Sequence, residues 1–185
     1  GADMIGLVFA KSTRQVTPEQ AREIVRAIPS GVATVGVFAD ESVEAINHAV
    51  RVSGVQMVQI ADSSEQVRLK RQLKRLTIVA RSTANPINAV PPPFADKQRS
   101  LTLLDSATTG LWGGTGRLGD WDVAAKWARE YPIILAGGLT PNNVGEAIRA
   151  VQPWGVDVSS GIEGPDGQKD PARMRAFVEA ARSAH

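Results

Sequence analysis

Short runs of apolar and β-branched residues recur along the 185-residue chain, with more polar segments between them. Continuous apolar runs of this length are typical of strands that are buried on both faces, as in a parallel sheet. The pattern predicts strands at Met4–Phe9, Val32–Phe38, Met57–Ile60, Leu76–Ala80, Leu101–Leu104, Ile133–Ala136 and Gly155–Val158.

Amphipathic segments lie between these runs and predict helices. The first helix begins at Thr17, because Thr17, Pro18 and Gln20 form a capping-box pattern, and Pro29 ends it. Further helices are predicted at Glu41–Ser53, Ser63–Leu73, Asp120–Glu130 and Thr140–Val151. The last helix begins at Asp170-Pro171, and we expect four of its apolar residues to face inward: Met174, Phe177, Val178 and Ala181.

The alternation of strands and helices indicates an α/β fold with a parallel sheet, either an open doubly wound sheet or a barrel. A complete eight-unit barrel needs about 25 to 31 residues per unit, so a chain of 185 residues holds about seven units. We therefore expect a TIM (βα)8-type barrel that is incomplete, with residues 1–185 as a single domain. Asn85–Ser100 is expected to be an extended surface connection, and Gly161–Lys169 a mobile loop.

The composition argues against several kinds of site and partner. The chain has no cysteine, which excludes a disulfide framework, a thiolate zinc site and a cysteine nucleophile within it, and its two histidines do not suggest a metal site. The net charge of +2 does not indicate a nucleic-acid surface. No apolar run approaches the ~20 residues that span a bilayer. We expect a cytoplasmic protein without a nucleic-acid or membrane partner, whose chain begins at Gly1 as if it had been cut.

Two glycine-containing turns follow the last two predicted strands. They are Ala136-Gly137-Gly138-Leu139-Thr140-Pro141-Asn142 and Val156-Asp157-Val158-Ser159-Ser160-Gly161. Backbone N–H groups that are exposed at such turns attract anions, and the last two turns of a (βα)8 barrel commonly hold phosphate. Each sequence alone could simply form a tight turn. Together they predict a phosphate site at Gly137, Gly138, Ser159, Ser160 and Gly161.

Asp105 ends the apolar run Leu103-Leu104-Asp105-Ser106. At the mouth of a barrel such an aspartate is partly desolvated, which favours its protonated form and suits proton donation. We predict Asp105 as a general acid; the alternative is a surface aspartate that merely ends a strand. The cluster Gly113-Gly114-Thr115-Gly116 predicts a flexible loop that approaches a ligand through Gly114 and Gly116, and its spacing does not match a dinucleotide-binding motif.

Arg14 follows the first predicted strand and could bind a carboxylate through two parallel hydrogen bonds. His48 and His185 are predicted to be structural or solvated. Trp112 could cover a ligand, whereas helix packing is predicted for the other tryptophans: Trp121, Trp127 and Trp154.

Segments spread over essentially the whole chain carry a family resemblance. They are Gly1–Phe9, Ser12–Val16, Val35–Phe38, Val58–Ile60, Leu104-Asp105, Gly113–Gly116, Leu135–Leu139 and Val156–Glu163. In this order they resemble phosphoribosylanthranilate isomerase, a (βα)8-barrel family of tryptophan biosynthesis. The resemblance implies the conversion of N-(5-phosphoribosyl)anthranilate to 1-(2-carboxyphenylamino)-1-deoxyribulose 5-phosphate, an Amadori rearrangement that needs neither a cofactor nor a metal.

The resemblance also implies residue roles. Asp105 would protonate the ribose ring oxygen, Arg14 would reach the anthranilate part of the substrate, and the two glycine-containing turns would hold the phosphate. The family's first strand carries a Lys-x-Cys-Gly motif whose cysteine is the general base, and this sequence starts at the second strand. Gln59-Ile60-Ala61-Asp62 and Val79-Ala80-Arg81-Ser82 also depart from the family pattern. We therefore expect impaired activity.

Two alternatives remain open at this point. The first is a non-catalytic barrel fragment that binds phosphate or associates with itself through open sheet edges. A related phosphosugar barrel of histidine or tryptophan biosynthesis is the weaker alternative.

Overall fold

The computed structural model describes residues 1–62, 72–73, 75–83, 100–106 and 120–184. The chain divides into two compact units, and each is described by itself. The N-terminal unit comprises Ala2–Ala80 with Asp96–Ser100, and the C-terminal unit comprises Gly1, Arg81–Ala95 and Leu101–His185. The predictions that concern residues 63–71, 84–99, 107–119 and 185 lie outside the described residues.

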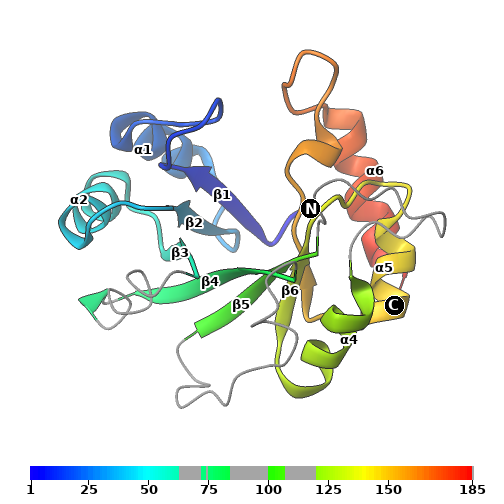
Figure 1. The fold of residues 1–185 in the computed structure, drawn as a ribbon. Coiled ribbons are helices and arrows are strands. Elements are labelled where there is room, and N and C mark those ends of the chain that lie inside the picture. Colours follow the sequence, from blue (N-terminus) through cyan, green and yellow to red (C-terminus); the bar gives the residue numbers. More distant parts are fainter. Residues whose placement is uncertain (63–71, 74, 84–99, 107–119, 185) are drawn as a thin grey trace. The chain divides into compact units, whose positions relative to one another are not determined.

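The N-terminal unit alternates strands with helices (Figure 1). Its elements are β1 (Met4–Val8), α1 (Pro18–Ala27), β2 (Ala33–Val37), α2 (Val43–Ser53), β3 (Met57–Ala61) and most of β4 (Leu76–Ser82). The strands pair in parallel in chain order, β1 with β2, β2 with β3 and β3 with β4. The predicted capping box of α1 is confirmed, because the Gln20 N–H donates to Thr17 Oγ1 and the Thr17 N–H donates to Gln20 Oε1.

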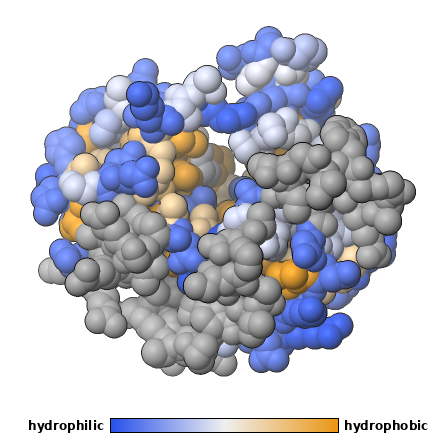
Figure 2. Space-filling model, in the orientation of Figure 1, coloured by the Kyte–Doolittle hydropathy of each residue, from blue (hydrophilic) through white to orange (hydrophobic). Residues whose placement is uncertain are grey.

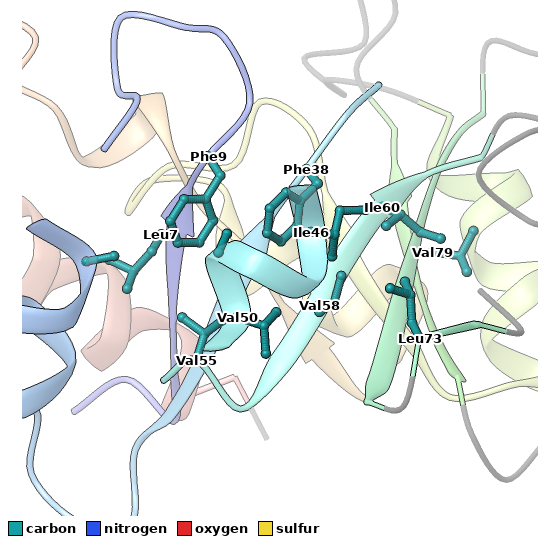
Figure 3. Close-up of a cluster of buried hydrophobic side chains, with 12 residues drawn as sticks. Leu7, Phe9, Phe38, Ile46, Val50, Val55, Val58, Ile60, Leu73 and Val79 are labelled. Carbon is teal, nitrogen blue, oxygen red and sulfur yellow. The ribbon is translucent and has the colours of Figure 1, made fainter. Parts of the chain in front are cut away.

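The core of the N-terminal unit lies between its strands and helices (Figure 3). The rings of Phe9 and Phe38 stack with their centroids 5.0 Å apart. Ile46 of α2 and Ile60 of β3 are completely buried in the same cluster. Burial of whole aliphatic and aromatic side chains contributes about 1.5 to 3 kcal/mol each, so this cluster is the main source of stability in the unit.

The C-terminal unit continues the same alternation. Its elements are most of β5 (Ser100–Asp105), α4 (Trp121–Glu130), β6 (Ile133–Ala136), α5 (Val144–Val151), β7 (Gly155–Val156), the 3-10 helix η3 (Ser160–Ile162) and α6 (Pro171–Arg182). Strand β6 pairs in parallel with both β5 and β7. A separate core holds Trp127 of α4, Leu135 of β6 and Val144 of α5, all completely buried.

All of the predicted strands are found, with ends that differ by at most two residues from the prediction. Packing of Trp121 and Trp127 is confirmed, since 2% and 0% of their surface is exposed. Packing of Trp154 was predicted wrongly: the residue is 58% exposed in the short connection between α5 and β7. Met174 was also wrongly expected to face inward, because α6 buries only a narrow stripe centred on Phe177.

Hydrophilic residues cover most of the described surface on the side that Figure 2 shows, and hydrophobic residues gather near α1 and α2. His48 of α2 is exposed, as expected for a solvated histidine. Among the described residues, no helix combines the length and the apolar character that crossing a membrane requires.

Candidate functional site

A row of residues crosses the carboxyl ends of β5, β6 and β7. Asp105, the last residue of β5, pairs in register with Ala136, the last residue of β6. Leu135 pairs with Val156, and the Asp157 N–H donates to the Leu135 carbonyl oxygen at 2.8 Å, so Asp157 is level with Ala136. Residues level with one another on parallel strands point to the same face, and two strand spacings separate the backbones of Asp105 and Asp157 by about 10 Å. The small Ala136 side chain therefore lies between two carboxyl groups.

The end of this row is fixed by Ser106, which is completely buried. Its N–H donates to the Ala136 carbonyl oxygen at 2.9 Å, and its Oγ donates to the same oxygen at 3.0 Å. Two donors on one carbonyl oxygen satisfy both of its lone pairs and hold the end of β6 against the end of β5.

The pKa of the Asp157 carboxyl group is clearly shifted. Burial among surrounding atoms raises the pKa of Asp157 above its ordinary value of 3.8, the charge of Asp105 raises it further, and the Lys169 ammonium group opposes both. The residue still has exposed surface, so its desolvation is partial. Asp105 is exposed as Asp157 is, and the partial desolvation that the sequence predicted for Asp105 stays a prediction. The desolvated carboxyl of the row is Asp157, and a carboxyl of this kind holds a proton at higher pH than a free aspartate does.

The turn after β6 is built on glycine. Gly137 has φ 96° and Gly138 has φ 64°, values that other residues rarely adopt, so the Gly-Gly pair is required here. The Asn143 side chain braces the turn: its Nδ2 donates to the Gly138 carbonyl oxygen at 3.0 Å, and its Oδ1 accepts from the Thr140 N–H at 2.7 Å. Both bonds stay within this turn, which fixes its shape ahead of α5.

The turn after β7 packs directly against the turn after β6. A Cβ added at Gly161 would collide with the Leu139 carbonyl oxygen and would lie 3.2 Å from the Thr140 Cα. Both of these atoms belong to the backbone, which cannot give way as the end of a side chain can. Glycine at position 161 therefore allows the backbones of the two turns to touch.

Gly161–Lys169, predicted as a mobile loop, is a hydrogen-bonded hairpin. Glu163 and Lys169 form an isolated antiparallel bridge, and the Gly164 N–H donates to the Gln168 carbonyl oxygen at 2.8 Å. The Lys169 Nζ donates to the Ser159 carbonyl oxygen at 2.8 Å and to Glu163 Oε1 at 2.7 Å. The hairpin therefore closes back onto the residues that follow β7.

Most of the predicted site residues come together in the C-terminal unit. Asp105 stands at the end of β5, and the turns that contain Gly137, Gly138, Ser159, Ser160 and Gly161 follow β6 and β7. Arg14 belongs to the N-terminal unit, where it lies exposed in the loop after β1 and its N–H donates to Ser12 Oγ at 3.2 Å. Gly114 and Gly116 lie outside the described residues.

Three residues of the site were not singled out from the sequence: Asp157, Asn143 and Lys169. Asp157 belongs to a motif that the sequence did indicate. That it lies in one row with the Asp105 carboxyl group follows only from the register of the strands. Asn143 had a local signal, because an Asn just before a helix commonly bonds to nearby backbone groups. Among the residues that the structure covers, no cluster of three or more His, Asp or Glu side chains could hold a metal ion.

Comparisons with known proteins show the family to which the chain belongs. The profile of a family described as "N-(5'phosphoribosyl)anthranilate (PRA) isomerase" matches residues 1–180. The N-(5'-phosphoribosyl)anthranilate isomerase of Roseiflexus sp. is 41% identical over 100% of this chain and 89% of its own length. The enzyme of the same name from Pelobacter propionicus is 40% identical over 98% of this chain and 86% of its own length.

Solved structures that are similar to this chain are isomerases of the same family. Phosphoribosyl anthranilate isomerase from Thermotoga maritima has a TM-score of 0.84 and 34% identity, over 99% of this chain and 89% of its own. A second isomerase structure, in complex with reduced 1-(o-carboxyphenylamino)-1-deoxyribulose 5-phosphate, has a TM-score of 0.80 and 31% identity over the same shares. These similarities confirm the predicted α/β fold of the (βα)8-barrel type. The chain belongs to the N-(5'-phosphoribosyl)anthranilate isomerase family.

Proposed function

We propose that the carboxyl ends of β5, β6 and β7 bind N-(5'-phosphoribosyl)anthranilate and support its isomerisation to 1-(2-carboxyphenylamino)-1-deoxyribulose 5-phosphate. The observation that carries this assignment is the Asp105–Ala136–Asp157 row beside two glycine turns whose backbones touch at Gly161. Such a site combines proton-transfer groups with an anion-binding backbone, and a phosphorylated sugar needs both. The substrate itself is inferred from the names of the relatives.

The phosphate group is assigned to the two turns. Gly137 and Gly138 both have positive φ angles in the turn at the end of β6, and glycine turns of this kind can present backbone N–H groups to an anion. Ser159, Ser160 and Gly161 come from the neighbouring turn, which packs against Leu139. Backbone donors from two adjacent turns can surround a phosphate that one turn contacts only from one side.

Asp105 is assigned as the general acid. Proton transfer from Asp105 to the ribose ring oxygen allows the bond between that oxygen and C1 to break, while the anthranilate nitrogen forms a double bond to C1. Asp157 shares the row, and the charge of Asp105 contributes to the raised pKa of Asp157.

The role of Arg14 toward the anthranilate carboxylate stays a prediction, which rests on the ability of a guanidinium group to bind a carboxylate through two parallel hydrogen bonds. Gly114 and Gly116 stay predictions for the loop that approaches the substrate. Self-association and a cytoplasmic location also stay predictions, which sedimentation and cell fractionation would test.

The first test is a titration of the ¹⁵N-labelled chain with reduced 1-(2-carboxyphenylamino)-1-deoxyribulose 5-phosphate, followed by amide NMR. We expect saturable shifts at Gly137, Gly138, Ser160 and Gly161, and smaller ones from the same analogue without its phosphate. A well-dispersed spectrum in which these four amides do not move would contradict the assigned phosphate site.

The second test concerns the acid. Asp105→Asn keeps the size of the side chain but cannot donate a proton in the same way, so we expect kcat to fall by about 10² to 10⁴, with a smaller change in KM. Asp3→Asn, which removes the same charge from an exposed position, is the matched control. A kcat of Asp105→Asn equal to that of Asp3→Asn, in an assay that detects turnover by the wild-type chain, would refute the role of Asp105.

A further inference from the structure

Lys169 links three parts of the C-terminal unit that the proposed function uses. Its Nζ donates to the Ser159 carbonyl oxygen at 2.8 Å, inside the assigned phosphate turn. The same Nζ donates to Glu163 Oε1 at 2.7 Å, and the ammonium charge also acts on Asp157. One side chain therefore contacts the turn, closes the hairpin and influences a carboxyl of the Asp105–Ala136–Asp157 row.

The partner carboxylate of Lys169 is held in place. The Glu163 side chain is only 10% exposed, whereas that of Lys169 is 43% exposed. Arg173 of α6 donates through Nη1 to the Glu163 carbonyl oxygen at 2.8 Å, and the Asp170 N–H donates to the Ile162 carbonyl oxygen at 2.9 Å. Lys169 immediately precedes Asp170, which caps α6. These bonds attach the base of the hairpin to α6. The Lys169 side chain then links the hairpin to Ser159.

We propose that Lys169 is a positioning residue that holds the turn after β7 in the shape in which its backbone binds the substrate phosphate. This inference rests on the proposed function. Two of the three N–H donors of the ammonium group are directed to Ser159 and Glu163, and Glu163 neutralises its charge. Lys169 therefore acts through the turn and not as the phosphate ligand itself.

The proposal separates Lys169 from a residue that merely stabilises the fold. A brace of the phosphate turn affects ligands that carry the phosphate and leaves the binding of the remainder of the ligand unchanged. A purely structural residue affects both equally. The phosphate-bearing reduced product analogue and the same analogue without its phosphate are therefore the two probes.

For Lys169→Met we expect the Kd of the phosphate-bearing analogue to rise about tenfold, roughly the effect of losing one charge-assisted hydrogen bond. The Kd of the analogue without phosphate should stay within about twofold of wild type. Lys169→Arg keeps a cationic donor and should recover most of the affinity. Lys126→Met, which removes an exposed lysine from α4, is the matched control and should change neither Kd.

A second measurement does not need a ligand. In the free Lys169→Met chain, the amide resonances of Ser160 and Gly161 should shift while those of Gly137 and Gly138 shift less. The proposal is wrong if the Ser160 and Gly161 resonances do not shift. It is also wrong if Lys169→Met binds the phosphate-bearing analogue with the affinity of wild type. If wild type fails to bind this analogue, the proposed function fails, and the amide shifts of the free variant still decide whether Lys169 holds the turn.

Discussion

The turns that follow β6 and β7 stand side by side, yet they are braced in different ways. In the turn after β6 the brace is the neutral Asn143 side chain, whose two hydrogen bonds reach Gly138 and Thr140. In the turn after β7 the brace is the charged Lys169 side chain, which reaches back ten residues to Ser159 and pairs with Glu163. One turn is therefore closed locally by an amide, and the other is closed at a distance by an ion pair.

Because the two braces differ in charge, the turn after β6 and the turn after β7 should respond differently to pH and salt. Amide hydrogen bonds do not depend on ionisation near neutral pH. A partly exposed ion pair contributes about 0 to 1 kcal/mol and weakens as salt screens it. We therefore expect the turn after β6 to be the fixed half of the site and the turn after β7 to be the half that pH and salt can alter.

The largest effect is expected from breaking the contact between the two turns. Gly161→Ala places a Cβ against the Leu139 carbonyl oxygen, so the two backbones must move apart. We expect the free energy of unfolding to fall by about 1 to 3 kcal/mol, the usual cost of overpacking. Binding of the phosphate-bearing product analogue should be lost over the concentrations at which wild type saturates. Chemical denaturation and a binding titration measure the two effects.

The matched control is Gly164→Ala in the same hairpin. There a Cβ would lie 3.1 Å from Asp166 Oδ1, the end of a flexible side chain, and 3.9 Å from the Gln168 carbonyl oxygen. A small loss of stability and nearly normal binding are expected. If both variants behave alike, the touching backbones are not what the site depends on.

The fold was largely predictable because its signals are local. Ile133–Ala136 was predicted with the observed ends, since a run of apolar residues between a helix and a glycine pair leaves little choice. The capping box at Thr17 was equally clear. The exposure of Trp154 was not predictable, because whether an aromatic residue in a short connection packs or protrudes depends on neighbours that are distant in sequence.

The site was predictable only in part, for the same reason. Gly137, Gly138 and Gly161 carry visible signals, because glycine marks unusual φ angles and close approaches of backbone. Asp157 became a partner of Asp105 only through the register of β5, β6 and β7, which a single sequence does not reveal. Lys169 looks like any loop lysine until its bond to Ser159 is seen.

The second prediction tests the brace of the turn after β6. Asn143→Ala removes both side-chain bonds, to the Gly138 carbonyl oxygen and from the Thr140 N–H. At about 0.5 to 1.5 kcal/mol per hydrogen bond, and with one bond in an exposed setting, we expect a loss of about 1 to 2 kcal/mol. This loss should be independent of salt. Thermal unfolding at low and high salt measures it.

Asn142→Ala is the control for this brace, because the Asn142 N–H that donates to Thr140 Oγ1 belongs to the backbone and survives the substitution. Its stability should stay close to that of wild type. A loss at Asn143→Ala that shrank with salt would contradict the distinction between a neutral brace and a charged one.

The third prediction concerns Asp157 and pH. Because the folded chain raises the pKa of Asp157 above 3.8, the folded state binds this proton more tightly than the unfolded state does. The free energy of unfolding therefore carries a penalty that is absent below pH 3.8, grows as pH rises towards the raised pKa and is complete above it. Asp157→Asn removes the penalty. The free energy of unfolding of this variant, relative to wild type, should therefore increase as the pH rises from 3.8 to the raised pKa.

Denaturation curves at a series of pH values measure this difference, with Asp3→Asn as the control for a change of charge. Since Lys169 opposes the shift, Lys169→Met should raise the pKa of Asp157 further and move the window to higher pH. A relative stability of Asp157→Asn that fell with rising pH would mean that attraction by Lys169 outweighs burial.

The smallest effect is expected from Glu163→Gln, which removes the charge of the ion pair but leaves the Lys169 bond to the Ser159 carbonyl oxygen. We expect a loss of at most about 1 kcal/mol at low salt that disappears near 1 M salt, where screening acts over about 3 Å. Affinity for the phosphate-bearing analogue should fall by less than in Lys169→Met, because the lysine still reaches the turn. If Glu163→Gln weakened binding as much as Lys169→Met, the bond to Ser159 could not hold the turn without the ion pair. The charged brace would then depend on both of its ends, in contrast to the brace at Asn143, where one side chain makes both bonds.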